Sequence, residues 1–303
     1  MADAIVVQDL RKSYGSFEAV KGIDLTIAEG EVFALLGPNG AGKTTIVEIL
    51  EGFRERTAGQ VSVLGHDPAK RDRALLAQVG IVLQSTGVDP YLTVAETVDL
   101  YRGYYPRPRP LDEVIDLVGL QEKRDARVAK LSGGQQRRLD VAIALAGDPT
   151  LLFLDEPTTG FDPSARRAAW EVVKNLVAIG KTVFLTTHFM DEAQYLANRV
   201  AVIAKGEIVA EGPPSMLGGR SEGVTTVSFR LADGAATDQL PDWGQSPGAD
   251  GTYVVRTEDP TTFLHQLTGW AIGHGTRLEG LEARRPTLED VYLELTGGEV
   301  GAE

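Results

Sequence analysis

The sequence predicts an α/β fold with a partly parallel sheet in its larger part and a small α+β unit after it. Over the first two thirds of the chain, short apolar segments of strand length alternate with segments of helical spacing, which is the pattern of a sheet layered with helices. A segment rich in proline and glycine, residues 211–223, then interrupts this alternation. For a chain of 303 residues, at about 150 residues per domain, we expect two domains, residues 1–217 and 218–303.

The strands of the larger domain are predicted from continuous apolar runs or from alternating apolar and polar residues. They are expected at residues 5–10, 23–27, 31–36, 61–64, 79–83, 151–154, 182–186, 200–203 and 208–210. Helical spacing predicts helices at residues 44–52, 111–119, 165–178 and 190–197. Residues 88–146 are expected to form a mostly helical subdomain, and its first helix has a cap in Thr93 with Glu96 three residues on.

The smaller domain has the same two kinds of signal on a shorter scale. Strands are expected at residues 224–231, 252–256 and 278–283, and helices at residues 260–270 and 287–295. We therefore expect an accessory α+β domain of residues 218–303 behind the larger one.

Composition narrows the class of protein. Hydrophobic residues make up 43% of the chain and charged residues 24%, which is enough for a sizeable core. The 30 basic and 43 acidic side chains give a net charge of −13, whereas a nucleic-acid partner would call for a basic face. Cysteine is absent, which excludes disulfides and thiolate chemistry. No apolar run approaches the about 18 residues of a membrane span and the start lacks a signal peptide, so we expect a cytoplasmic chain.

The segment GPNGAGKT, residues 37–44, lies between the apolar strand 31–36 and a helical segment. It fits the pattern G-x-x-x-x-G-K-[ST], in which glycines let successive backbone amides point at a phosphate beside a helix N-terminus. We expect Lys43 to reach the β- and γ-phosphates of a nucleotide and the Thr44 hydroxyl to bind Mg²⁺. The expected nucleotide-binding residues here are Gly37, Pro38, Asn39, Gly40, Ala41, Gly42, Lys43, Thr44 and Thr45.

The segment LLFLDEP, residues 151–157, places two acids at the carboxyl end of an apolar strand. Ligands of open α/β sheets bind at that edge. Asp155 is expected to hold Mg²⁺, and Glu156 to orient or deprotonate the attacking water. Without the phosphate loop upstream, the same pair would indicate an ordinary strand end.

The segment LSGGQ, residues 131–135, precedes a strongly helical run. Ser132 can cap this helix, while Gly133 and Gly134 leave its N-terminal amides uncovered, which makes a second anion site. Taken alone, the segment is also typical of a turn followed by a capped helix.

In this order and spacing, GPNGAGKT, LSGGQ and LLFLDEP resemble the nucleotide-binding domain of ABC transporters, over about residues 4–217. The resemblance implies a P-loop NTPase of the ABC type, with a mixed sheet core and a helical subdomain, that hydrolyses ATP with Mg²⁺. In that family two domains close head to tail over two ATP molecules. Ser132, Gly133, Gly134 and Gln135 of one copy would face the nucleotide of the other, so the resemblance implies a second such domain, another copy or a paralogue.

Four further positions match the family one by one. Tyr14 matches the aromatic residue that stacks on adenine, and Gln84 matches the glutamine that contacts Mg²⁺ and the attacking water. Asp162 matches the dimer-contact loop, where the family more often has leucine than Phe161, and His188 matches the histidine that contacts the γ-phosphate. The expected catalytic set is therefore Glu156, His188, Gln84 and Lys43, and the expected metal set is Thr44, Gln84 and Asp155. The other histidines are expected on the surface or in packing, namely His66, His265 and His274.

The kind of ABC protein is indicated by what surrounds these motifs. Residues 88–105 resemble the region that docks the membrane subunit, and the tail RRPTLEDVYLELTG, residues 284–297, resembles ATPases of ABC-2 type multidrug and daunorubicin-resistance exporters. We expect the ATPase of a drug exporter at the inner face of the cell membrane, paired with a multi-span permease that contacts the exported molecule. Alternatives are a soluble ABC ATPase that remodels ribosomes or DNA, an importer ATPase, and the ATPase of a polysaccharide or lipid exporter.

Overall fold

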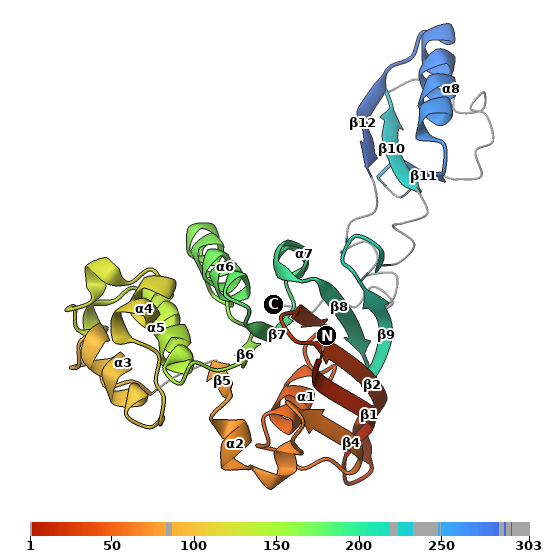
Figure 1. Cartoon of the computed structure of the whole chain (residues 1–303). Coiled ribbons are helices and arrows are strands. Elements are labelled where there is room, and N and C mark those ends of the chain that lie inside the picture. The colour runs from red at the N-terminus through yellow and green to blue at the C-terminus, as the bar shows by residue number, and fades with distance from the viewer. Residues whose placement is uncertain are drawn as a thin grey trace. The chain divides into compact units, whose positions relative to one another are not determined.

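A computed structural model describes residues 2–82, 87–217, 224–232, 248, 250–284, 288 and 292. The chain divides into two compact units, the first reaching Pro214 and the second beginning at Ser215, within the segment rich in proline and glycine. In Figure 1 the first unit runs in colour from red to green, and the helix of the second unit is blue.

The first unit contains two sheets. An antiparallel sheet has the order β2-β1-β4, with β1 at Asp3–Tyr14, β2 at Phe17–Ala28 and β4 at Ala58–Val63. A six-stranded sheet has the order β5-β6-β7-β3-β8-β9. Its strands are β3 (Val32–Leu36), β5 (Val79–Val82), β6 (Leu151–Asp155), β7 (Thr182–Thr187), β8 (Arg199–Ala204) and β9 (Glu207–Gly212).

The six-stranded sheet is parallel from β5 to β8, and β9 pairs with β8 in antiparallel register. Its central strands are continuous apolar runs because both faces are covered. Phe33 of β3, Phe153 of β6 and Phe184 of β7 pack in the core, with ring centroids 5.8 Å and 5.6 Å apart. The expected strands and the mixed sheet are confirmed, and the division into two sheets is an addition that the periodicity did not reveal.

Helices complete the first unit. They are α1 (Lys43–Leu50), α2 (Arg73–Leu76), α3 (Val94–Arg102), α4 (Leu111–Leu117), α5 (Gly133–Leu145), α6 (Pro163–Ala178) and α7 (Met190–Leu196), with short 3₁₀ turns at Pro68–Lys70, Gln121–Lys123 and Val128–Lys130. The expected capping box of α3 is confirmed, because Thr93 and Glu96 exchange hydrogen bonds of 2.8 Å and 3.2 Å. The helices α3, α4 and α5 contact one another, as expected of a helical subdomain.

In the second unit, the described residues form an antiparallel sheet in the order β11-β10-β12 and a long helix. These are β10 (Thr225–Leu231), β11 (Tyr253–Thr257), α8 (Pro260–Gly273) and β12 (Leu278–Arg284). Phe229 and Tyr253 of the sheet pack with Phe263 and Leu267 of α8 in a small core. The helix expected at residues 287–295 lies outside the described residues, apart from Leu288 and Tyr292, which are buried.

This topology gathers three loops at one edge of the six-stranded sheet. The strands β3, β6 and β7 are parallel neighbours, with Leu36 opposite Thr187 and Asp155 opposite Thr186. Their carboxyl ends therefore lie together, which is where α/β sheets bind ligands.

Candidate active site

The phosphate loop leaves β3 and enters α1. Gly37 is fixed by its surroundings, because a Cβ there would lie 2.5 Å from the Ile203 carbonyl oxygen. Gly42 has φ +110°, and a Cβ there would meet the Ala19 carbonyl oxygen at 2.8 Å. Asn39 and Gly40, at the loop tip, are exposed. The sequence therefore folds into the open glycine loop that a phosphate group requires.

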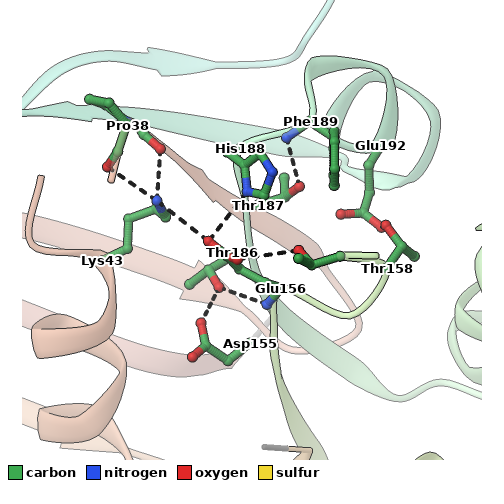
Figure 2. Close-up of polar contacts among 12 residues, drawn as sticks. Pro38, Lys43, Asp155, Glu156, Thr158, Thr186, Thr187, His188, Phe189 and Glu192 are labelled. Carbon is green, nitrogen blue, oxygen red and sulfur yellow. Dashed lines mark hydrogen bonds and ion pairs between the residues drawn. The ribbon is translucent and has the colours of Figure 1, made fainter. Parts of the chain in front are cut away.

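Lys43 is held inside this loop. Its Nζ donates to the carbonyl oxygens of Gly37 and Pro38 at 2.7 Å and 3.2 Å, and it lies 3.8 Å from Glu156 Oε1 (Figure 2). The side chain is only 6% exposed. Burial lowers the pKa of Lys43, while the carboxylates of Glu156 and Asp155 oppose that shift. A phosphate entering the loop would give this buried ammonium group an anionic partner in addition to Glu156.

Glu156 contacts groups from several segments of the site. Its φ of +45° is unusual for a residue with a side chain, and its N–H donates to the backbone and hydroxyl oxygens of Thr186, each at 3.1 Å. Thr159 donates to Glu156 Oε2 at 3.2 Å, and His188 Nδ1 lies 3.4 Å from Glu156 Oε1 (Figure 2). The strained backbone therefore presents the carboxylate to Lys43 and His188 together.

Asp155 ends β6, directly before Glu156. Its carboxylate accepts a hydrogen bond from the Thr186 hydroxyl. Hard oxygen donors of this kind suit Mg²⁺, which takes one or two protein ligands and fills its other positions with water and phosphate. The described residues contain no group of three or more His, Cys, Asp or Glu side chains that could hold a metal alone, and such a cage is not needed here.

The LSGGQ segment starts α5 as expected. Ser132 Oγ accepts from the Gln135 N–H at 3.3 Å, and Gln135 Oε1 accepts from the Ser132 N–H at 2.9 Å, which completes a capping box. A cavity of about 820 Å³ lies beside this helix start, lined by Ser132, Gly133 and Gly134 together with Glu156, Gly160 and Asp162. The LSGGQ segment and Glu156 thus face one space, while Lys43 is not among the residues that line it.

The remaining expected residues are placed as follows. Tyr14 ends β1 and is 42% exposed, and the cations of Lys12 and Arg54 lie 5.1 Å and 5.4 Å from the centroid of its ring. Asp162 caps α6, because its Oδ1 accepts from the N–H groups of Ser164 and Ala165 at 2.8 Å and 2.9 Å. These hydrogen bonds, led by those from Ser164, lower the pKa of Asp162. Gln84 lies outside the described residues.

The other histidines make contacts within their own compact units or are exposed. His66 Nδ1 is 3.6 Å from Asp72, His265 is exposed, and His274 stacks on Trp270 with centroids 4.9 Å apart. Each is a surface or packing contact.

Arg137 is a site residue that the sequence reasoning missed. It lies on α5, is 8% exposed, and donates to the backbone oxygens of Asp155 and Pro157 at 3.0 Å and 3.3 Å. It therefore holds the chain on both sides of Glu156 and ties it to the LSGGQ helix. The only signal was its place in the first turns of this helix, two residues after Gln135, which many surface arginines share.

Glu192 was missed as well. It lies on α7, is fully buried, and its Oε1 accepts from the Thr158 hydroxyl at 2.8 Å and the Trp170 indole N–H at 3.0 Å. Burial raises the pKa of Glu192. The side chain ties the loop after Glu156 to the helix that follows His188 (Figure 2).

The fold and this site define an ABC-type ATPase. A profile of the ABC transporter family matches residues 20–159, and a profile of a C-terminal domain of ABC transporter domain-containing proteins matches residues 225–287. The chain belongs to the ABC transporter ATP-binding proteins, a family of ATP-hydrolysing cassettes.

Named relatives extend over the whole chain. The chain is 41% identical to the Nod factor export ATP-binding protein I of Rhizobium sp. strain N33 over 98% of both chains. It is 40% identical to the protein of that name from Rhizobium meliloti, over 98% of this chain and 89% of the relative.

Among solved structures, it is similar to the dimeric ATP-binding cassette MJ0796 bound to ADP and Pi. The TM-score is 0.60 at 28% identity, over 69% of this chain and 98% of that one. Within the described residues, no helix has both the length and the apolar character needed to cross a membrane.

Proposed function

We propose that this chain is the motor subunit of an exporter, which hydrolyses ATP to drive a separate membrane permease. The observation that carries the proposal is the meeting of Lys43, Glu156 and His188 at one edge of the sheet, with contacts of 3.8 Å and 3.4 Å to one carboxylate oxygen. The names of the relatives, which are export ATP-binding proteins, favour export as the direction.

The proposed roles follow from the chemistry of each group. The phosphate loop and Lys43 bind the phosphates, Tyr14 stacks on the base, and Thr44, Asp155 and Gln84 hold Mg²⁺, which neutralises charge on the phosphates. Glu156 takes a proton from the attacking water, and its contact with His188 keeps the carboxylate aimed at the γ-phosphate. Asp162 and Ser132 contribute to the site of a second domain, as the dimeric form of the cassette MJ0796 suggests.

This arrangement makes ATP a bridge between two domains. A ligand held by Lys43 of one copy and Ser132 of the other favours the closed pair by its greater affinity for that state. Hydrolysis removes the bridge, the pair opens, and the permease follows this cycle. The exported molecule contacts the permease, so the residues of this chain do not identify it. Drug efflux is supported by the resemblance of residues 284–297 alone. The relatives named for Nod factor export keep a polysaccharide or lipid cargo as the second candidate.

The test is a pair of measurements on Glu156→Gln. This variant should bind ATP and accumulate as an ATP-bound dimer in size-exclusion chromatography, while steady-state hydrolysis falls by about 100-fold or more. Wild-type chain with ADP serves as the monomer reference. Hydrolysis at the wild-type rate in Glu156→Gln would refute the assignment of the base.

A further inference from the structure

A buried carboxylate outside the active site has no polar partner. Glu51 is the C-cap residue of α1 and is 7% exposed. Its backbone N–H donates to Val47, but among the described residues its carboxylate makes neither a hydrogen bond nor an ion pair. A buried carboxylate in that state is costly, and its neighbours here make it costlier.

Those neighbours are negative. The carboxylates of Asp155 and Glu48 add to burial, and together they raise the pKa of Glu51 to about 8. The C-terminus of a helix also carries partial negative charge, so Glu51 lies at the unfavourable end of α1 for an acid. Every electrostatic influence on this carboxylate therefore favours a cation beside it.

The carboxylate lines a cavity of about 260 Å³. The other lining residues are apolar or aromatic, namely Leu50, Leu75, Leu76, Val79, Ile81, Tyr101, Tyr105, Ile143 and Ala144. Sites for small-molecule ligands usually measure about 300–1,000 Å³, so this cavity fits one long side chain better than a drug-sized molecule. Two tyrosines and one carboxylate suit a planar guanidinium, which stacks on aromatic rings and pairs with carboxylates through two hydrogen bonds.

The position of Tyr105 is fixed by the fold. A Cβ at Gly147 would lie 2.4 Å from the Tyr105 ring, so the ring packs directly against backbone. The aromatic wall is therefore present before any ligand arrives.

We propose that this cavity is a binding site for one arginine side chain, presented by a segment of the membrane protein with which the chain works. The guanidinium chemistry follows from Glu51 and the tyrosines, whereas the membrane origin of the arginine rests on the proposed function.

The first test measures guanidinium binding without any partner. The nucleotide-free full chain is titrated with n-butylguanidinium chloride, and the methyl NMR signals of Leu75, Val79 and Ile81 are followed. We expect saturable shifts, and we expect Glu51→Gln to weaken binding by about tenfold or more, because one member of a buried charge pair is lost. n-Butanol, which has the same chain without the cation, should give no saturable shift.

The matched control is Glu48→Gln. It removes one negative charge from the same helix, but Glu48 is partly exposed and already paired with Arg54 at 2.5 Å. Binding of n-butylguanidinium by this variant should stay within about twofold of the wild type. The proposal fails if the wild type shows no saturable shift, or if Glu51→Gln binds as tightly as the wild type.

The second test identifies the arginine. A photo-crosslinking residue replaces Leu76, which lines the cavity and is 41% exposed, and the membrane protein that co-purifies with the full chain is examined by mass spectrometry. We expect a cross-linked segment with an arginine whose change to glutamine removes the cross-link. A segment that still cross-links after all its arginines are changed would overturn the membrane origin. If no membrane protein co-purifies, the proposed function fails, while the guanidinium titration is judged separately.

Discussion

The charge state of Glu51 predicts a variant that is more stable than the wild type at alkaline pH. Burial raises the pKa of this carboxyl from 4.5 to about 8 in the folded chain. Between these two pH values the folded chain holds a proton that the unfolded chain has lost, so the free energy of unfolding falls as the pH rises. The slope is about 1.4 kcal/mol per pH unit, and the loss across the interval sums to about 5 kcal/mol.

Glu51→Gln has no proton to lose and should escape this loss. Its stability should match that of the wild type within about 1 kcal/mol near pH 5 and exceed it by about 4 kcal/mol near pH 8.5. The assay is urea unfolding of the nucleotide-free chain, followed by circular dichroism at a series of pH values. Glu48→Gln, whose carboxylate is paired and partly exposed, controls for the loss of one charge. A stability difference that stays constant with pH would refute the reasoning.

Substitutions at three further positions test the contacts around the active site. Arg137→Met removes the hydrogen bonds to the Asp155 and Pro157 oxygens, and we expect kcat to fall by about tenfold or more with a much smaller change in KM, measured by steady-state hydrolysis. Glu192→Ala leaves the hydroxyl of Thr158 and the indole of Trp170 without an acceptor and should cost about 2–5 kcal/mol in urea unfolding. Glu192→Gln, which keeps an acceptor, should recover most of the lost free energy of unfolding. Gly42→Ala should abolish binding of a fluorescent ATP analogue, because its φ is +110° and the Ala19 carbonyl blocks a Cβ.

The sequence predicted the phosphate loop, the acid pair and the capped LSGGQ helix because each depends on neighbours along the chain. A glycine pattern, an apolar run before two acids, and a serine three residues before a glutamine are local signals. The structure adds the reason why the phosphate loop and the acid pair meet, which is that β3 and β6 both pair with β7 in parallel.

Arg137, Glu192 and Glu51 could not be predicted in the same way. Each gains its meaning from residues distant in sequence: Arg137 from the backbone after β6, Glu192 from Thr158 and Trp170, and Glu51 from an apolar cavity. In sequence, Arg137 lies in a polar helix and Glu51 at a helix end, where a charged residue usually reaches solvent. Only their burial in the folded chain distinguishes these residues from ordinary surface charges.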